Sequence, residues 1–476
     1  MTMDLKGPPQ TSLAMDAGAV ADPSSGRSAF ALARLPRIMF GAGKSGELPE
    51  IVLSYGPRAL VIVRGRGFTA TPDWARIGTA LFAAGVDLVV AEVDGEPSPA
   101  QIDEIVAGVR GGSAGSAVAP VDVVVGIGGG SVLDTAKAVA GLLIPGNSVM
   151  DHLEGVGPQL PYRGPSVPFV AVPTTAGTGS EATKNAVLST HGEGAFKKSF
   201  RDEALVAAVA IVDPDLLAGC PPDLISSNGM DAVTQLIESY VSLRANPITD
   251  ALALSGLAAA RDGLLAWYEE AFSGPGGAGA GGAGTGHDGA DTGHDGAGAP
   301  SSPVAIARER MAYAALCSGI CLANAGLGAV HGLASPLGAQ FPIPHGAACG
   351  SVLAATTRVN IRALESRAPE SPALRRYADV GRVLAAGGTG GASGAAGATG
   401  AAGAAASAMS DVEARAALVS LLDNWRATLV VPWLSSFGIR ESMIHGIILD
   451  SRGSSMKTNP IVLTDEELAV ILRVSL

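Results

Sequence analysis

The stretch that decides the fold runs from Val121 to Asp134 and reads VDVVVGIGGGSVLD. A β-branched apolar run, 123–127, ends in three glycines and Ser131, and apolar residues then recur with helical spacing from Leu133 to Ala140. This pattern predicts a strand, a tight turn and the start of a helix. Glycine lets backbone N–H groups approach an anion closely, and the positive end of the helix dipole attracts phosphate. The stretch therefore predicts a nucleotide-binding turn, although glycines also serve ordinary turns.

A second glycine-containing stretch supports the nucleotide interpretation. Residues Pro173 to Glu181 read PTTAGTGSE and follow a second apolar run, 167–172. The stretch supplies hydroxyl groups on a loop that glycine loosens. Two such loops after buried strands suit one extended cofactor. The hydroxyl groups belong to Thr174, Thr175, Thr178 and Ser180.

Hydrophobic patterning divides the chain into two parts. Up to about residue 215, apolar runs of β-branched residues alternate with helical patterns, which indicates βαβ units and a mainly parallel sheet. After Asp213 the pattern changes to long helical segments, most clearly at 231–242 and 308–325. We therefore expect a Rossmann-like α/β domain at 36–215 and an all-helical domain at 216–476. The apolar runs are 59–63, 86–90, 121–127, 167–172 and 206–212.

Three segments lack this patterning. Residues 1–35 mix Pro, Gly, Ser and Asp without periodicity, and we expect a poorly ordered extension there. Residues 273–303 repeat TGHDGA, and 385–408 are almost wholly Gly, Ala, Ser and Thr. Such compositions predict flexible surface insertions in the helical domain. His287 and His294 in the first insertion are assigned no role.

Composition excludes several classes of partner. The 476-residue chain has a formal net charge of −12 and no basic patch, which argues against nucleic acid. Its four cysteines form no CxxC pair, and Cys317 and Cys321 sit in an apolar stretch as small hydrophobic residues. No run of about eighteen apolar residues and no export leader is visible. We therefore expect a cytoplasmic protein without a membrane partner.

The chain resembles the iron-containing (group III) alcohol dehydrogenases, which share a fold with dehydroquinate synthase and glycerol dehydrogenase. The resemblance extends from about Phe40 to the C-terminus and keeps the order of the family's landmarks. It implies an N-terminal Rossmann-like parallel-sheet domain followed by an all-helical domain. The landmarks here read GGGSVLDTAKAVA, PTTAGTGSE, IVDPDLL, GMDAVTQLIESYVS, NAGLGAVHGLASPLG, PHGAAC and SSMKTNP.

The resemblance implies a divalent metal, iron in the first place and zinc or manganese as alternatives. Matched by motif, its ligands would be Asp231, Gln235, His331 and His345, of which Asp231 and the two histidines would be catalytic. Gln235 departs from the family pattern, which has histidine there, and an amide oxygen is a harder ligand than imidazole. Ser335 stands where many members carry a histidine that relays protons. The chain therefore resembles a divergent branch.

The resemblance also implies a nicotinamide cofactor. It assigns the pyrophosphate to Gly129, Gly130 and Ser131, with Asp134 capping or bracing the turn, and the nicotinamide ribose and phosphate to Thr174, Thr175, Thr178 and Lys198. NAD-preferring members often end the first strand with an acid, whereas this strand ends in Arg64, Gly65 and Arg66. The arginines would allow NADP as well as NAD.

We therefore expect an NAD(P)-dependent oxidoreductase that interconverts a small alcohol and its aldehyde or ketone. Two alternatives stay open. Gln235 favours a metal-independent enzyme similar to the maleylacetate reductases. The remaining alternative is a nucleotide-binding pseudoenzyme, against which the intact glycine loops and histidines argue. The resemblance implies a homodimer.

Overall fold

The computed structural model describes residues 29–111, 119–190, 195–273, 302–387 and 396–476, and residues 33–476 form one compact unit. Nearly all of the predicted N-terminal extension lies outside the described residues. The same holds for the first insertion from 274 to 301, with its TGHDGA repeats, and for 388–395 of the second.

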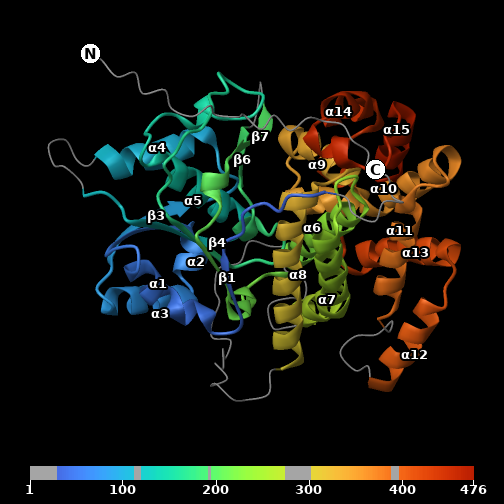
Figure 1. The fold of residues 1–476 in the computed structure, drawn as a ribbon, viewed down its shortest axis with the longest axis horizontal. Coiled ribbons are helices and arrows are strands. Elements are labelled where there is room, and N and C mark those ends of the chain that lie inside the picture. Colours follow the sequence, from blue (N-terminus) through green and yellow to red (C-terminus); the bar gives the residue numbers. More distant parts are fainter. Residues whose placement is uncertain (1–28, 112–118, 191–194, 274–301, 388–395) are drawn as a thin grey trace, which may run out of the picture. The chain divides into compact units, whose positions relative to one another are not determined.

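A six-stranded parallel sheet forms the N-terminal part, as the alternating pattern predicts (Figure 1). Its strand order is β1-β8-β5-β4-β2-β3, and every neighbouring pair is parallel. Five strands coincide with the five apolar runs of the sequence, while β1 lies outside them. The strands are β1 (Arg37–Phe40), β2 (Arg58–Arg64), β3 (Asp87–Val93), β4 (Val123–Gly128), β5 (Phe169–Pro173) and β8 (Val209–Val212).

Helices cover both faces of this sheet. One face packs with α5 and α4 in one apolar cluster, and the other packs with α1 and α3 in a second cluster. Burial on both faces explains why the strands read as continuous apolar runs rather than as alternating ones. A separate antiparallel hairpin, which the sequence did not predict, follows β5. These elements are α1 (Leu48–Leu53), α2 (Gly65–Thr69), α3 (Pro72–Ala83), α4 (Pro99–Gly111), α5 (Gly130–Leu142), β6 (Asn185–Thr190) and β7 (Phe196–Arg201).

The described residues after β8 contain helices and no strand, in agreement with the predicted helical part (Figure 1). The largest apolar cluster joins α6 to α8, α9 and α10. The helices are α6 (Pro222–Val241), α7 (Pro247–Ser273), α8 (Pro303–Ala325), α9 (Ala329–Gln340), α10 (His345–Arg367), α11 (Pro372–Ala385), α12 (Ala396–Ser407), α13 (Asp411–Thr428), α14 (Ile444–Ser451) and α15 (Asp465–Val474). Short 3-10 helices lie at 44–47, 149–151, 180–182, 203–205, 214–217, 434–437, 441–443 and 454–458.

One prediction for the second insertion needs correction. The segment 385–408 was expected to be a flexible insertion, but helix α12 occupies Ala396–Ser407. The reason is composition, because alanine has the highest intrinsic helix propensity and outweighs the few glycines of this segment.

Among the described residues, no single helix is long and apolar enough to cross a bilayer. Helices α8 and α9 meet the length and composition test only as a pair, across a bend of 101°. Both helices contribute many buried side chains to the helical part of the chain.

The second glycine loop packs directly against helix α8. Gly179 has the left-handed backbone conformation, with φ of 59°. A Cβ atom on Gly319 of α8 would lie 2.1 Å from the Gly179 carbonyl oxygen, closer than any real contact. Ser318 also donates a hydrogen bond from Oγ to the Gly177 carbonyl at 3.2 Å. Because Gly319 has no side chain, the loop can pack closely against the helical part.

We predict that Gly319→Ala lowers the free energy of unfolding by about 1–3 kcal/mol, because the added methyl group would collide with backbone that cannot easily move. Gly78→Ala in α3 is the control, since a Cβ atom there meets nothing within 4 Å. That control should gain about 0.5–1 kcal/mol, the usual advantage of alanine over glycine in a helix. Urea denaturation measures both. A stabilised Gly319→Ala protein would contradict the close contact.

Candidate functional site

The two glycine loops meet at the carboxyl ends of the neighbouring strands β4 and β5. Gly129 caps α5 without a side-chain hydrogen bond, so the first amides of that helix have no partner within the helix. A Cβ atom on Gly130 would lie 2.8 Å from Thr178 Oγ1, and one on Gly129 would lie 3.1 Å from Thr175 Oγ1. The structure therefore brings together the glycines and threonines that the sequence assigned to one cofactor.

Asp134, one turn into α5, connects this helix to the second glycine loop and to β6. Its Oδ1 accepts a hydrogen bond from Ser180 Oγ at 2.6 Å, and its Oδ2 accepts one from the Val187 amide at 3.0 Å. Lys137, one turn later, is fully buried with its Nζ 3.5 Å from Asp134 Oδ1. Nζ also donates to Ser180 Oγ and to Thr183 Oγ1, both at 3.0 Å. This polar network holds α5 and the second loop in one arrangement.

Glu181 is a further buried ionisable residue on the second loop. Its side chain is almost fully buried. Burial raises its pKa to about 7, and hydrogen bonding to its own backbone and the charge of Lys137 only partly oppose this rise. The carboxyl therefore keeps its proton over much of the range in which an exposed glutamate is ionised.

The lysine that faces the helical part is Lys197 rather than Lys198. Alternate residues of a strand point to opposite faces, and Lys198 is exposed on β7. Lys197 forms an ion pair with Glu96 at 2.6 Å, and its positive charge contributes to the pKa of His345. Lys198, the predicted cofactor contact, is thus the more exposed of the two lysines, and Lys197 lies within electrostatic range of His345.

An acid that the sequence analysis did not consider lies beside the end of β2. Arg64 is exposed there, and the side chain of Arg66 lies outside the description. A Cβ atom on Gly65 would lie 2.9 Å from Asp94 Oδ2, at the end of the adjacent strand β3. A carboxylate therefore occupies this edge after all, although it comes from the next strand.

Four potential metal ligands converge between α6, α9 and α10. Asp231, His331, His345 and Cys349 place one ligand atom each within 4.8 Å of all the others. Asp231 Oδ1 lies 3.3 Å from His331 Nε2 and 3.9 Å from His345 Nε2. The structure therefore brings together the three predicted catalytic residues, and it adds a cysteine to them.

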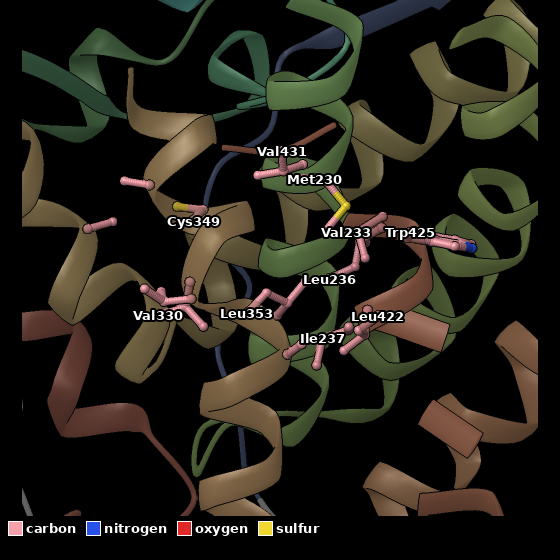
Figure 2. Packing of buried hydrophobic residues seen from close by; sticks show 14 of the residues in the cluster. Met230, Val233, Leu236, Ile237, Val330, Cys349, Leu353, Leu422, Trp425 and Val431 are labelled. Carbon is pink, nitrogen blue, oxygen red and sulfur yellow. The ribbon is translucent and has the colours of Figure 1, made fainter. Parts of the chain in front are cut away.

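Apolar side chains surround this cluster. Figure 2 shows Cys349 in the same hydrophobic cluster as Met230 and Val233 of α6, Val330 of α9 and Leu353 of α10. Asp231 and Cys349 are buried, and His345 is partly exposed. Such surroundings exclude water from the carboxylate and strengthen its electrostatic interactions.

Glu238 fixes the orientation of His331. Its Oε2 lies 2.6 Å from His331 Nδ1, and its Oε1 accepts a hydrogen bond from the Val330 amide at 2.7 Å. Because Nδ1 donates its proton to the carboxylate, Nε2 is the nitrogen that faces Asp231. This arrangement of carboxylate, histidine and ligand position is typical of metal-binding histidines.

The charges of the cluster shift its pKa values in opposite directions. Burial alone would lower the pKa of His331, but Cys349, Asp231 and Glu238 together raise it well above its ordinary value. Burial lowers the pKa of His345 to about 4, so that this ring is neutral at pH 7. For Asp231, burial is outweighed by the hydrogen bond and charges of the histidines, and the pKa is lowered.

The chemistry of this donor set fits a cation. Asp231 Oδ1 is buried, and within the described part of the chain it accepts no hydrogen bond unless a histidine ring beside it is protonated. It faces His331 Nε2, whose lone pair is directed at it when the ring is neutral, and two acceptors at 3.3 Å repel each other. A proton or a metal ion between them removes this repulsion.

Gln235 and Ser335 occupy the two positions that depart from the family pattern. Gln235 Nε2 donates to Asp231 Oδ2 at 3.2 Å, while its Oε1 lacks a partner in the described structure. In this arrangement the amide orients the carboxylate. Ser335 lies one turn after His331 on α9 and is partly buried.

Sequence reasoning missed Cys349 and Glu238. Cys349 follows His345 by four residues on α10, a spacing that places both side chains on one helix face. Glu238 follows Asp231 by seven residues, two turns along α6. Both spacings are visible in the sequence, but only the packing of three helices shows that they converge.

Comparisons with known proteins agree with this architecture. A family model described as "Iron-containing alcohol dehydrogenase" matches residues 36–214, and one described as "Fe-containing alcohol dehydrogenase family, C-terminal" matches residues 304–475. Alcohol dehydrogenase 4 of Saccharomyces cerevisiae (strain YJM789) is 33% identical over 318 residues, which cover 67% of this chain and 72% of that protein.

Two further proteins extend the comparison. The NAD-dependent methanol dehydrogenase of Bacillus methanolicus is 30% identical over 318 residues, covering 67% of this chain and 72% of that protein. The solved structure of sulfoacetaldehyde reductase from Bifidobacterium kashiwanohense in complex with NAD+ is similar in fold. Its TM-score is 0.71 at 23% identity, and the match covers 94% of this chain and 99% of that one.

We predict that Glu181→Gln stabilises the protein at about pH 8 and not at about pH 4. Between the ordinary pKa of 4.5 and the folded value of about 7, the unfolded chain loses a proton that the folded chain keeps, so stability falls as pH rises. The difference of 2.5 pKa units corresponds to about 3 kcal/mol, which the amide does not lose. Thermal unfolding at both pH values measures it. Glu104→Gln on the exposed face of α4 is the control, and equal gains at both pH values would contradict the prediction.

Proposed function

Because the chain belongs to the iron-containing alcohol dehydrogenase family, we propose that it interconverts a small alcohol and its aldehyde or ketone with NAD or NADP as hydride carrier. One observation carries this proposal: the buried Oδ1 of Asp231 faces the Nε2 atoms of His331 and His345. An alcohol can pass its hydride on only as its hydroxyl loses a proton, and this cluster concentrates groups that favour that loss.

The proposed cofactor site lies where the two glycine loops meet. The amides at the start of α5 and the hydroxyls of Thr175 and Thr178 supply donors for a pyrophosphate. NAD appears in the names of two of the similar proteins, which supports the assignment. The proposed contacts are Gly129, Gly130, Ser131, Thr174, Thr175, Thr178 and Lys198, with Asp134 as a brace, and the position of Lys197 supports adding it to them.

The proposed metal site has Asp231, His331 and His345 as its core. A divalent cation bound there would act as a Lewis acid toward the substrate oxygen. Glu238 keeps the Nε2 atom of His331 directed at the site, and Gln235 holds the second oxygen of Asp231. His345 is neutral at pH 7, so its Nε2 can act as a ligand without first losing a proton.

We also make proposals about the domain boundary, the oligomeric state and the compartment. We propose a domain boundary near residue 215, which the separate family-model matches on either side of 215–303 support. We also propose a homodimer in the cytoplasm. The four free cysteines suit a reducing compartment.

We predict that Gly130→Val weakens NADH binding by more than about a hundredfold, or about 2.7 kcal/mol. The first carbon of the new side chain would lie 2.8 Å from Thr178 Oγ1 and fill the space between the loops. Titration of NADH fluorescence measures the affinity. Gly446→Val in α14 is the control, because a Cβ atom there meets nothing within 4 Å. Unchanged affinity in Gly130→Val would remove the loops from the cofactor site.

We predict that NAD and NADP support turnover within about a hundredfold in kcat/KM. Arg64 favours the 2′-phosphate of NADP, and Asp94 near Gly65 opposes it. A screen of small alcohols, aldehydes and ketones with both cofactors tests the reaction and the ratio together. Asp94→Asn should raise the efficiency with NADP and leave that with NAD nearly unchanged. An NAD preference well above a hundredfold in the native enzyme would contradict the prediction.

A further inference from the structure

The side chain of Cys349 faces the two histidines of the cluster. Its Sγ lies 3.8 Å from His331 Nε2 and 3.9 Å from His345 Nε2, so the sulfur faces two imidazole nitrogens. The nearby apolar side chains explain why a small residue packs on this turn of α10, but they do not explain a sulfur directed at both nitrogens.

The spacing of the ligand atoms matches a tetrahedral metal site. Zinc binds sulfur at about 2.3 Å and nitrogen or carboxylate oxygen at about 2.0–2.2 Å, which places ligand atoms about 3.3–3.6 Å apart in a tetrahedron. Four of the six separations among the ligand atoms of Asp231, His331, His345 and Cys349 are 3.3, 3.8, 3.9 and 3.9 Å, and all six are within 4.8 Å. An ion would have to draw these atoms together to reach tetrahedral distances.

We propose that the thiolate of Cys349 is the fourth protein ligand of the metal site, together with Asp231, His331 and His345, and that the site consequently prefers zinc. The proposal rests on the proposed function in that it takes the site to hold a metal. It replaces the expected role of Gln235, whose amide nitrogen donates to Asp231 Oδ2, whereas Asp231 Oδ1 is the oxygen that faces the two histidines. Gln235 is then a positioning residue for the carboxylate.

Sulfur changes which metal the site selects. Thiolate is a soft ligand that favours zinc, whereas a site of carboxylate, amide and imidazole would also accept manganese or magnesium. On binding, the Sγ–H bond breaks, the Sγ–metal bond forms and the proton passes to solvent, so the sulfur is neither oxidised nor reduced. Burial raises the pKa of Cys349 to about 12 without a metal, and a divalent charge in contact with sulfur reverses that cost.

Cobalt(II) absorption tests the proposal on the full-length protein without using activity. Cobalt replaces zinc in such sites, and a cobalt–thiolate bond gives a charge-transfer band in the near ultraviolet that nitrogen and oxygen ligands do not give. The native protein should show this band, and Cys349→Ser should lose it. Cys317→Ser is the matched control, because Cys317 is equally buried and lies outside the cluster. Gln235→Ala should keep the band.

The outcomes separate this inference from the proposed function. A native protein that binds cobalt without the band, or a Cys349→Ser protein that keeps it, overturns the role of Cys349 and leaves the metal site standing. A native protein that binds no cobalt and no zinc overturns the metal site itself, while the NADH titration still tests the cofactor. We further expect Cys349→Ser to weaken zinc binding by more than about a hundredfold, since loss of groups that only orient ligands costs 10–100-fold.

A measurement on the native protein covers the case in which Cys349→Ser does not fold. X-ray absorption of the zinc-loaded chain should show one sulfur neighbour at about 2.3 Å among nitrogen and oxygen neighbours. A zinc shell without sulfur overturns the proposal.

Discussion

The structure depends on the buried carboxylate of Asp231. One of its oxygens is held by Gln235, and the other faces the imidazole nitrogens of His331 and His345. A buried anion in contact with ring nitrogens is unfavourable unless positive charge lies among them. Three helices, α6, α9 and α10, carry the residues that meet at this oxygen. The packing of these helices therefore sets the geometry of the site.

The α/β part and the helical part are joined by close backbone contacts. Gly179 packs on Gly319 of α8, and the same loop is held to α5 through Asp134 and Lys137. The proposed cofactor site and the metal cluster are thereby linked through one chain of packed elements. Hydride transfer requires the two reacting carbons to be held about 3–3.5 Å apart in a fixed orientation. A contact between backbones holds two parts of a protein more rigidly than a contact between flexible side chains.

Most of the sheet could be predicted from sequence because its buried strands are continuous apolar runs. Strand β1 was missed because it has four residues and none fully buried, and the hairpin β6–β7 because polar residues interrupt it. The sequence also does not tell which face Lys197 and Lys198 each point to, since adjacent residues of a strand point to opposite faces and the orientation of the strand comes from the fold. Helix α12 shows the opposite error, in which glycine content was weighted above alanine propensity.

Motifs predicted three members of the cluster of potential metal ligands, and they did not point to Cys349. Asp231, His331 and His345 converge as their motifs imply, because motif order reflects a shared fold. Cys349 escaped notice because a cysteine in an alanine-rich helix looks like a small core residue, and its distance from His331 depends on how α9 packs on α10. Glu238 was missed for the same reason, as its partner lies 93 residues away.

Activity after removal of metal tests the central claim most directly. The purified protein should lose turnover on exhaustive chelation, with metal content falling in parallel, and should regain it when a divalent metal is returned. Full turnover with no detectable metal would contradict the account. His331 and His345 would then have to polarise the substrate carbonyl directly as hydrogen-bond donors.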